Sequence, residues 1–463
     1  MDLPTVFPNS KHRMSFDLHL KEQKALALYC LKWCALGTWV GVLSGTASAA
    51  FLAALGWATN TRVQHPLLLW GLPLAGAATG WVYSRYGKSV EGGNNLVLDT
   101  IHDPKQAIPF RMAPLILIST VATHLFGGSA GREGTAVQMG GTLATASVGP
   151  LRLSRLDHRV LIMAGVAGGF GSVFGTPIAG MVFGMEVLAV GRMQYDGLLP
   201  CLVASFVGDL VCRKLGIQHH LYSVSTVPDL ESITLPLVVL AGVFFALASQ
   251  MFIEATAYVH RTVNKWIPMP WLRTAAGGLA VALLGTILGS EYLGLSLPLI
   301  ERSFDVQSQA PWVFAVKILL TAITLGCGFK GGEVTPLFCI GATLGSAFAG
   351  ITHQPTSFFA GLGFVAVFAG AANTPLACAI MGIELFGAKM AVPLAITCSI
   401  SYILSGHRGI YLSQRISTRK GESADGEKMQ TLRQNRTGIV ASENVVLEVG
   451  GFVISEDPSE EKS

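Results

Sequence analysis

Charged side chains are scarce in this sequence. Asp, Glu, Lys and Arg make up 13% of its 463 residues, and hydrophobic residues make up 51%. An ordinary soluble domain carries about 25% charged residues. The mean hydropathy of +0.52 is equally unusual for a soluble chain. These values predict an integral membrane protein, and the formal net charge of +4 is too small to indicate binding to nucleic acid.

Several functional motifs are also missing. The eight cysteines lie mostly in apolar runs and lack the paired spacing of a metal site or a disulfide framework, and the eleven histidines show no metal-ligand spacing. No GxxxxGK[ST] loop occurs, which argues against an ATP-driven pump. No nucleophile or cofactor motif accompanies the acidic residues, so we expect neither an enzyme nor a bound metal or cofactor. The charged first thirty residues argue against a cleavable signal peptide and for a cytoplasmic N-terminus.

An Arg-Glu pair lies in the glycine-rich, largely apolar stretch 125–141 (LFGGSAGREGTAVQMGG). An ionisable side chain at membrane depth is costly and is a functional candidate by default. Glycines allow successive backbone N–H groups to converge on one point, and a helix that starts there adds its positive end. The stretch therefore predicts an anion site that also holds the Glu133 carboxylate. The alternative is a salt bridge between Arg132 and Glu133 in a surface loop.

Two motifs recur half a chain apart. Residues 131–143 (GREGTAVQMGGTL) match residues 331–344 (GGEVTPLFCIGATL) at an offset of 200, and residues 175–186 (GTPIAGMVFGME) match residues 373–384 (NTPLACAIMGIE) at an offset of 198. Hydrophobicity alone does not produce Thr-Pro pairs and buried glutamates in the same order. The chain therefore consists of two related halves, and transporters built in this way bind their substrate between the halves. Glu186 and Glu384 occupy matching positions, which favours a structural role such as capping neighbouring helices.

Four regions follow from these patterns. Residues 1–34 are expected to form a cytoplasmic N-terminal segment, with an amphipathic surface helix at 15–33 that does not span the membrane. Residues 35–215 and 233–411 form the two membrane repeats, and 412–463 is a polar, cytoplasmic and partly disordered tail. The apolar segments expected in the membrane are 35–59, 66–83, 112–125, 161–190, 198–211, 233–259, 274–288, 312–328, 335–351, 358–385 and 391–404.

These motifs resemble the CLC family of anion channels and proton-coupled anion exchangers, over about residues 20–412. Glu133 in the GREG core looks like that family's external gating glutamate, residues 332–336 (GEVTP) look like its second anion-binding loop, and Tyr411 looks like its inner pore tyrosine. The resemblance implies an all-α integral membrane protein with two inverted-topology helical repeats and broken helices. It further implies a homodimer in the cell's inner (plasma) membrane, with both termini cytoplasmic.

The departures from the family pattern indicate a branch. Gly93 and Asn94 stand where chloride-handling members carry a serine, and Val334 stands where a phenylalanine is usual. Val187 occupies the position of the inner proton-transfer glutamate of the chloride exchangers. This set of changes looks like the fluoride/proton antiporter branch.

Fluoride holds its water tightly, so a site for it needs strong and close hydrogen-bond donors. The Asn94 amide, the Thr335 and Tyr411 hydroxyls and backbone N–H groups supply such donors. We expect Glu133 and Glu333 to carry protons; a structural cap on a broken helix is the alternative for Glu333. The expected function is export of fluoride in exchange for protons, with a chloride/proton exchanger or a passive chloride channel as alternatives. The residues expected to bind the anion are Gly93, Asn94, Arg132, Gly134, Val334, Thr335 and Tyr411.

Overall fold

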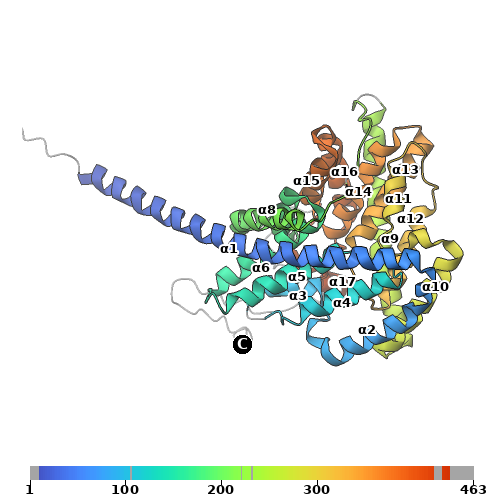
Figure 1. Ribbon diagram of the computed structural model, residues 1–463. Coiled ribbons are helices and arrows are strands. Elements are labelled where there is room, and N and C mark those ends of the chain that lie inside the picture. The colour runs from blue at the N-terminus through green and yellow to red at the C-terminus, as the bar shows by residue number, and fades with distance from the viewer. Residues whose placement is uncertain (1–9, 105–106, 221, 231–232, 422–429, 438–463) are drawn as a thin grey trace, which may run out of the picture.

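The computed structural model describes residues 10–104, 107–220, 222–230, 233–421 and 430–437, and these residues are mostly helical (Figure 1). The first repeat and the chain before it contain α1 (Ser10–Gln64), η1 (Pro66–Gly71), α2 (Leu72–Tyr86), η2 (Lys88–Val90), α3 (Asn94–His102), α4 (Met112–Leu125), α5 (Glu133–Val148), α6 (Arg155–Phe174), α7 (Pro177–Glu186), β1 (Ala189–Val190), η3 (Tyr195–Gly197) and α8 (Leu198–Lys214). The second repeat and the chain after it contain α9 (Thr234–Trp266), α10 (Pro270–Leu288), η4 (Ser290–Tyr292), α11 (Leu297–Ser303), α12 (Val313–Gly326), α13 (Val334–Thr352), α14 (Thr356–Ala372), α15 (Pro375–Phe386), η5 (Ala388–Met390), α16 (Ala391–Leu404), β2 (Arg415–Ile416), β3 (Gln430–Thr431) and α17 (Leu432–Thr437).

The helix α1 differs from the expected surface helix followed by a separate span. It runs without a break for 55 residues, and its N-terminal part projects beyond the other helices (Figure 1). No proline interrupts it before Pro66, so nothing in the sequence stops the helix near residue 34. Gly37, Gly41 and Gly45 recur one turn apart, and a methyl group added to any of them would collide with α8. Small residues at this spacing allow two membrane helices to pack closely.

Apolar helices of membrane length recur along the chain. Among the described residues, five are long and apolar enough to cross a membrane: Lys21–Gln64 within α1, Tyr195–Lys214, Thr234–Trp266, Pro270–Leu288 and Val334–Thr352. Five shorter apolar helices accompany them: Met112–Leu125, Val313–Gly326, Thr356–Ala372, Pro375–Phe386 and Ala388–Leu404. The protein is therefore a multi-pass membrane protein with several short spans.

Two of the expected apolar segments are each a pair of helices. In the first repeat, Gly175 ends α6 at a φ of +75°, and Pro177 starts α7. In the second repeat, Asn373 ends α14 at a φ of +56°, and Pro375 starts α15. A left-handed residue satisfies the end of one helix, and proline lacks the N–H that a continuous helix would need. The Thr-Pro motifs thus mark the points where helices break at membrane depth.

The two repeats face each other across a twofold axis. Gly131 and Gly332 form an antiparallel bridge, with N–H to carbonyl oxygen distances of 2.6 and 2.8 Å. The Glu186 carboxylate accepts hydrogen bonds from two N–H groups at the start of α15, and the Glu384 carboxylate accepts two at the start of α7. Reciprocal contacts between matching residues are what inverted repeats produce. The capping role predicted for the two glutamates is confirmed.

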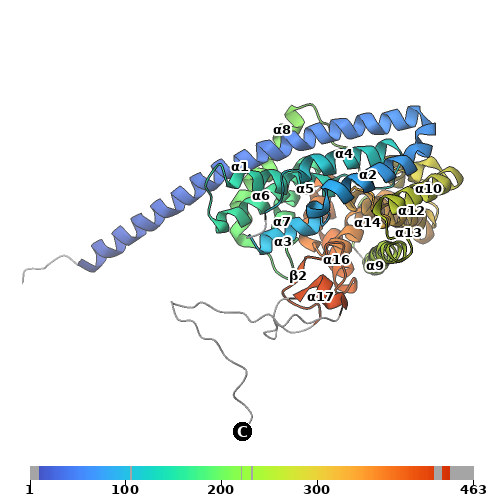
Figure 2. The same ribbon diagram turned by 90° about the horizontal axis from the view of Figure 1, so that it is seen from below.

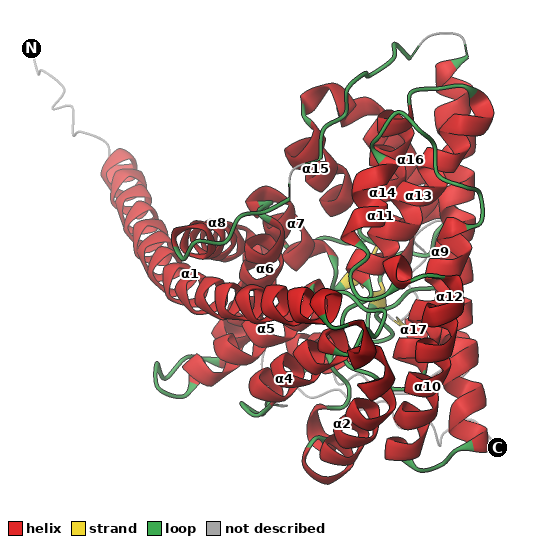
Figure 3. Ribbon diagram, turned by 45° about the vertical axis from the view of Figure 1, so that its right-hand side comes forward, coloured by secondary structure: helices red, strands yellow, loops and turns green. Residues whose placement is uncertain are grey.

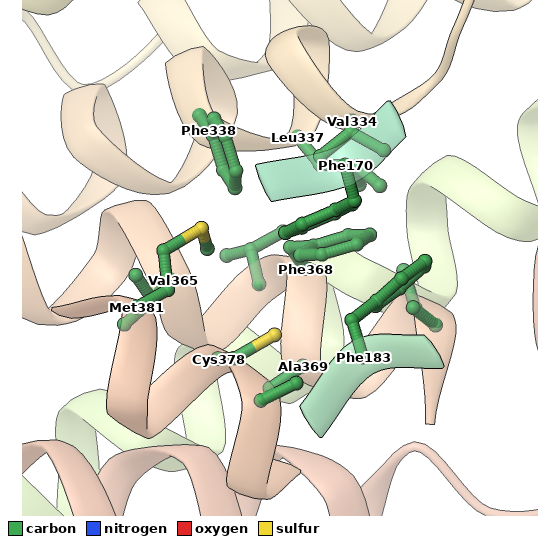
Figure 4. Close-up of a cluster of buried hydrophobic side chains, with 14 of the residues drawn as sticks. Phe170, Phe183, Val334, Leu337, Phe338, Val365, Phe368, Ala369, Cys378 and Met381 are labelled. Carbon is green, nitrogen blue, oxygen red and sulfur yellow. The ribbon is translucent and has the colours of Figure 1, made fainter. Parts of the chain in front are cut away.

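Stacked phenylalanines fill the core where the repeats meet (Figure 4). Phe170 of α6, Phe183 of α7 and Phe368 of α14 form a triangle of stacked rings, with centroids 4.1 Å apart for Phe170 and Phe183, 6.3 Å for Phe170 and Phe368, and 6.1 Å for Phe183 and Phe368. Val334 and Leu337, in the first turn of α13, pack into the same cluster. The start of α13 is therefore supported by large apolar side chains from both repeats.

A small sheet, absent from the sequence analysis, attaches the chain after α16. β2 pairs in parallel with β1 and antiparallel with β3. Together with α17 it lies below α16 in the view of Figure 2, and loops of both repeats meet near the middle of the molecule in Figure 3. The part of the tail at 412–421 and 430–437 is thus ordered against the membrane body. The expected disorder elsewhere in the tail, and the segment 1–9, lie outside the described residues.

Candidate anion and proton site

Glu133 is the first residue of α5 and is fully buried. Its carboxylate crosses to the second repeat, where it accepts a hydrogen bond from Thr335 N at 3.0 Å and lies 2.6 Å from the Thr335 hydroxyl through either oxygen. Thr335 is in the first turn of α13, so the carboxylate lies at a helix N-terminus, where free N–H groups favour an anion. The donors for an anion at this point are therefore occupied by the protein's own carboxylate.

Arg132 completes the contact around Glu133. Its Nε lies 3.3 Å from one carboxylate oxygen, and its backbone N–H donates to the other at 3.2 Å. The Arg132–Glu133 pair exists, as both readings of the sequence required, but it is buried at the junction of the repeats and is not in a surface loop. Thr135 takes no part, because its hydroxyl pairs with the Thr120 hydroxyl at 2.8 Å.

Asn94, Gly134 and Glu333 surround one point next to this contact. A methyl group added at Gly134 would lie 2.9 Å from Asn94 Nδ2 and 3.7 Å from Glu333 Oε2. Asn94 Oδ1 and Glu333 Oε2 are both buried and have no hydrogen-bond partner among the residues that the structure describes. Buried polar atoms in this position normally pair with an ion or a water molecule.

Gly93 and Asn94 lie at the start of a helix. Gly93 has a φ of +56° and directly precedes α3, whose first residue is Asn94. Gln138 of α5, which the sequence analysis missed, lies beside Gly93, since an added methyl group there would be 3.4 Å from Gln138 Nε2. A lone glutamine in an apolar helix after the GREG motif was the signal available for it.

Tyr411 and Val334, both expected to bind the anion, have buried side chains that pack against phenylalanines. Tyr411 is buried, contacts Phe183 edge-on with ring centroids 6.4 Å apart, and interacts electrostatically with both Glu333 and Glu133. Val334 is buried with its side chain in the phenylalanine cluster. Its contribution to an anion site could come only from its backbone.

Two cavities adjoin Glu133 and Arg132. One of about 20 Å³ is lined by Glu133, Thr335 and the rings of Phe174, Phe338 and Phe364, and it has room for one particle the size of water. The other, of about 1020 Å³, is lined by Arg132 and by residues from the end of α1, the loop after α8 and the start of α11. Arg132 thus lies both at the carboxylate and in the wall of the wider cavity.

Glu333 lines a third cavity, of about 390 Å³, together with His260 near the end of α9. α9 begins at Thr234, shortly after the loop that lines the wide cavity. His260 lies about 40 Å further along the helix at 1.5 Å per residue, roughly the thickness of a membrane. Glu133 and Glu333 therefore adjoin cavities that open toward opposite ends of α9.

Lys317 of α12 is a buried cation that the sequence analysis missed. Its ammonium lies 2.8 to 3.2 Å from four neutral oxygens: Ser129 Oγ, Tyr292 O, Gly294 O and Ser296 Oγ. It therefore joins the glycine-rich loop before Glu133 to the wall of the wide cavity. A single lysine inside the apolar run VFAVKILL was the available signal.

The described residues contain no group of three His, Cys, Asp or Glu side chains placed to hold a metal ion. His124 lies 2.8 Å from Thr120 O and 3.0 Å from Ala130 O through its two ring nitrogens, so both nitrogens have a backbone partner.

Comparisons with known proteins identify the family. A family model described as voltage gated chloride channel matches residues 75–406. A protein of Pseudomonas syringae pv. tomato named chloride/fluoride channel protein is 50% identical over 406 residues, covering 86% of this chain and 90% of that protein. The crystal structure of a CLC-type fluoride/proton antiporter is similar with a TM-score of 0.81 and 34% identity, over 84% of this chain and 98% of that one. A slow cyanobacterial Cl⁻/H⁺ antiporter, 20% identical with a TM-score of 0.70 over 81% of this chain and 94% of its own, shares the fold. With a family model that matches well over half of its length, this chain belongs to the voltage gated chloride channel, or CLC, family.

Proposed function

We propose that this protein is a fluoride/proton antiporter that exports fluoride in exchange for inward-moving protons. The observation that carries the proposal is the Glu133 carboxylate seated on Thr335 N and the Thr335 hydroxyl. A carboxylate in that place competes with any anion for the same donors. The names of the Pseudomonas syringae protein and of the antiporter of known structure support the same function, because the first names fluoride with a channel and the second names fluoride with protons.

When the Glu133 carboxylate is protonated, fluoride replaces it at the start of α13. A protonated carboxyl accepts weaker hydrogen bonds than a carboxylate, so it leaves the start of α13 when it gains a proton. Fluoride then takes the N–H and hydroxyl of Thr335, with the Asn94 amide nearby. Glu133 then loses its proton, and the ionised carboxylate returns to the Thr335 donors and expels the anion. One side chain thereby couples the two movements.

Glu333 carries the proton between Glu133 and the cavity on the other face. It lines that cavity, and its Oε2 also lies beside Gly134, the residue that follows Glu133. Tyr411, which interacts electrostatically with both glutamates, contributes a hydroxyl donor to the anion. Gly93, Arg132, Gly134 and the backbone of Val334 complete the proposed anion site.

The tight cavity beside Glu133 favours fluoride over chloride. Its volume of about 20 Å³ admits one particle the size of water, and the rings of Phe174, Tyr222, Phe338 and Phe364 form part of its wall. Fluoride is close to water in size, whereas chloride is larger. A chloride/proton exchanger and a passive chloride channel remain the alternatives, and both predict comparable or faster chloride flux.

We further propose a homodimer in the inner membrane of the cell with both termini in the cytoplasm, as the family resemblance implies. The exposed apolar row Leu198, Leu202, Phe206 and Leu210 on α8 suits a lipid or protein neighbour. Cross-linking in native membranes tests the dimer, and labelling of cysteines introduced at each end of the chain tests the orientation.

The functional test compares fluoride and chloride efflux from proteoliposomes while external pH is recorded under a clamped membrane potential. The wild-type protein should move fluoride much faster than chloride, with proton uptake in fixed proportion. Glu133→Gln mimics the protonated form and should abolish the proton movement, whether fluoride flux stops or becomes a leak. Proton movement that stays proportional to fluoride in Glu133→Gln would overturn the mechanism, and comparable efflux of the two anions would overturn the selectivity.

A further inference from the structure

His220 lies in the wall of both cavities that adjoin Glu133. It is in the loop after α8, and it lines the wide cavity of about 1020 Å³ as well as the tight cavity of about 20 Å³ beside the Glu133 carboxylate. Among the described residues, Arg132 and Leu297 are the other two that line both of these cavities. Arginine keeps its proton in a protein and leucine has none to exchange, whereas histidine both gains and loses one. His220 is therefore placed to pass protons from one cavity to the other.

A carboxylate orients the His220 ring from the side of the wide cavity. His220 Nδ1 lies 3.4 Å from Glu301 Oε1, and the two side chains are 46% and 53% exposed. Glu301 is on α11 and lines the wide cavity but not the tight one. The partner of one ring nitrogen determines which nitrogen carries the proton, so a carboxylate at Nδ1 leaves Nε2 to exchange the second proton. The ring is therefore held in place by Glu301 while solvent in the wide cavity reaches it.

The neighbouring charged groups of the wide cavity have partners of their own. His219 Nε2 lies 3.6 Å from Oδ1 of the buried Asp209 on α8. Arg302 of α11 pairs with Glu291. His219, Arg302 and Glu291 line the wide cavity and not the tight one. Of the two adjacent histidines, His220 is therefore the one that shares the tight cavity with the anion site.

Tyr222 indicates that the two carboxylates on either side of this path are close together. It lines the tight cavity and interacts electrostatically with Glu301, Glu133 and Arg132. Arg132 is held at Glu133 through its Nε, 3.3 Å from a carboxylate oxygen, and keeps its charge throughout. The tight cavity between His220 and Glu133 has room for one water molecule. A proton that moves from the ring to the carboxylate thus crosses a single small space.

We propose that His220 is the proton relay between the solvent of the wide cavity and the Glu133 carboxylate. An imidazolium N–H of His220 gives its proton to a water molecule in the tight cavity, and that water gives one of its own protons to Glu133. The neutral imidazole then regains a proton from solvent, so the number of protons is conserved. The inference rests on the fluoride/proton exchange proposed above and names the residue that supplies its proton. Without His220 the exchange keeps its proton-to-fluoride ratio and becomes slower.

The test measures fluoride efflux from proteoliposomes in weakly buffered solution under a clamped membrane potential. His220→Gln should slow the efflux by about tenfold or more, because a positioned proton donor or acceptor accelerates such a step by about 10²–10⁴-fold. The proton-to-fluoride ratio, obtained from the external pH, should stay at the wild-type value. His65→Gln is the matched control, because His65 is an exposed histidine that lines neither cavity, and it should leave the rate unchanged.

Imidazole added equally to both sides of the membrane distinguishes a relay from a structural role. The free base has the same chemistry as the missing side chain and can carry protons through the wide cavity. It should therefore restore fluoride efflux by His220→Ala to within about threefold of the wild-type rate. Potassium gluconate at the same ionic strength should not restore it.

Glu301→Gln leaves His220 in place and removes only the carboxylate that orients it, so it should slow efflux by about twofold to threefold. The proposal is overturned if His220→Gln transports fluoride at the wild-type rate, if imidazole fails to restore efflux by His220→Ala, or if either variant changes the proton-to-fluoride ratio. If both His220 variants fail to fold, an unaltered rate in Glu301→Gln overturns it. Absence of proton-coupled fluoride efflux from the wild-type protein would instead overturn the proposed function.

Discussion

The two reciprocal carboxylates should stabilise the fold without taking part in transport. Glu186 accepts hydrogen bonds from Leu376 N at 3.0 Å and Ala377 N at 2.8 Å, and Glu384 accepts them from Ile178 N and Ala179 N at the same two distances. Each carboxylate lies at or near the C-terminal end of its own helix and caps the N-terminus of the other. The antiparallel pair α7 and α15 is therefore closed at both ends.

The cost of removing one cap follows from these contacts. A hydrogen bond to a charged group contributes about 1.5–3 kcal/mol. Glutamine keeps one acceptor oxygen and places an NH₂ group against the second donor, so Glu186→Gln loses one bond and the charge of the other. The neutral glutamine also avoids the desolvation cost of a buried carboxylate, and this offsets part of the lost hydrogen-bond energy. We expect Glu186→Gln to lower the free energy of unfolding by about 2–4 kcal/mol, and Glu384→Gln, whose side chain is more exposed, by about 1–2 kcal/mol.

The change in the free energy of unfolding is measured on the detergent-solubilised protein, with tryptophan fluorescence as the signal. Glu291→Gln, which breaks an exposed pair with Arg302, should cost less than about 1 kcal/mol and is the control. The double variant should cost less than the sum of the single variants, because both caps hold the same helix pair. Changes below about 0.5 kcal/mol at both sites, or unchanged stability with an altered proton-to-fluoride ratio, would refute the structural assignment.

Two further predictions concern the transport site. Asn94→Ser replaces a two-donor amide by a single hydroxyl, so the ratio of fluoride to chloride efflux from proteoliposomes should fall more than the fluoride rate does; an unchanged ratio would remove Asn94 from the selectivity site. Glu333→Gln keeps the shape of the side chain but cannot titrate, so proton-coupled fluoride movement should be lost while the protein elutes from gel filtration as the wild-type protein does. Normal coupling of protons to fluoride in Glu333→Gln would show that Glu333 has only a structural role.

The sequence predicted contacts within repeated motifs better than contacts between distant unrelated segments. The joining of Glu133 to the loop that contains Thr335 could be expected, because the two motifs match and such repeats meet at the substrate. The buried Lys317 could not be placed, because its four oxygen partners come from segments that share no motif with it. The docking of the tail was missed for a related reason, since two-residue strands and the single buried Leu432 leave almost no periodic pattern.

The long helix α1 exposes a limit of composition-based reasoning. A change from charged to apolar residues near position 34 marks where the surroundings change, and it does not require the helix to end. Helices end at proline, at left-handed residues or at capped turns, none of which occurs there. The boundary at residue 34 remains a prediction about the membrane surface, and the continuous backbone neither supports nor opposes it.

The duplicated motifs place a carboxylate on the helix start of the other repeat only once. The reason is that the structural alignment of the two repeats differs by one residue from the sequence alignment. Sequence identity aligns Glu133 with Glu333, an offset of 200. The Gly131–Gly332 bridge and the starts of α5 and α13 both give an offset of 201, which pairs Glu133 with Val334. At the first position of its helix, Glu133 points across the junction to α13. Val334, at the equivalent position, packs into the phenylalanine cluster and leaves the start of α5 without a carboxylate from the other repeat.

This one-residue shift also explains why the two glutamates can do different work. Glu333 precedes its helix, so its side chain leaves the backbone about 100° away from the direction that a first-turn residue would take. It lies beside Gly134 and in the wall of the opposite cavity, and not on the donors of α5. An inverted repeat with strict side-chain symmetry would place two identical carboxylates on two identical helix starts. The shift instead places one carboxylate on the donors at the start of α13 and the other in the wall of a different cavity, so the two side chains can take the different roles proposed above.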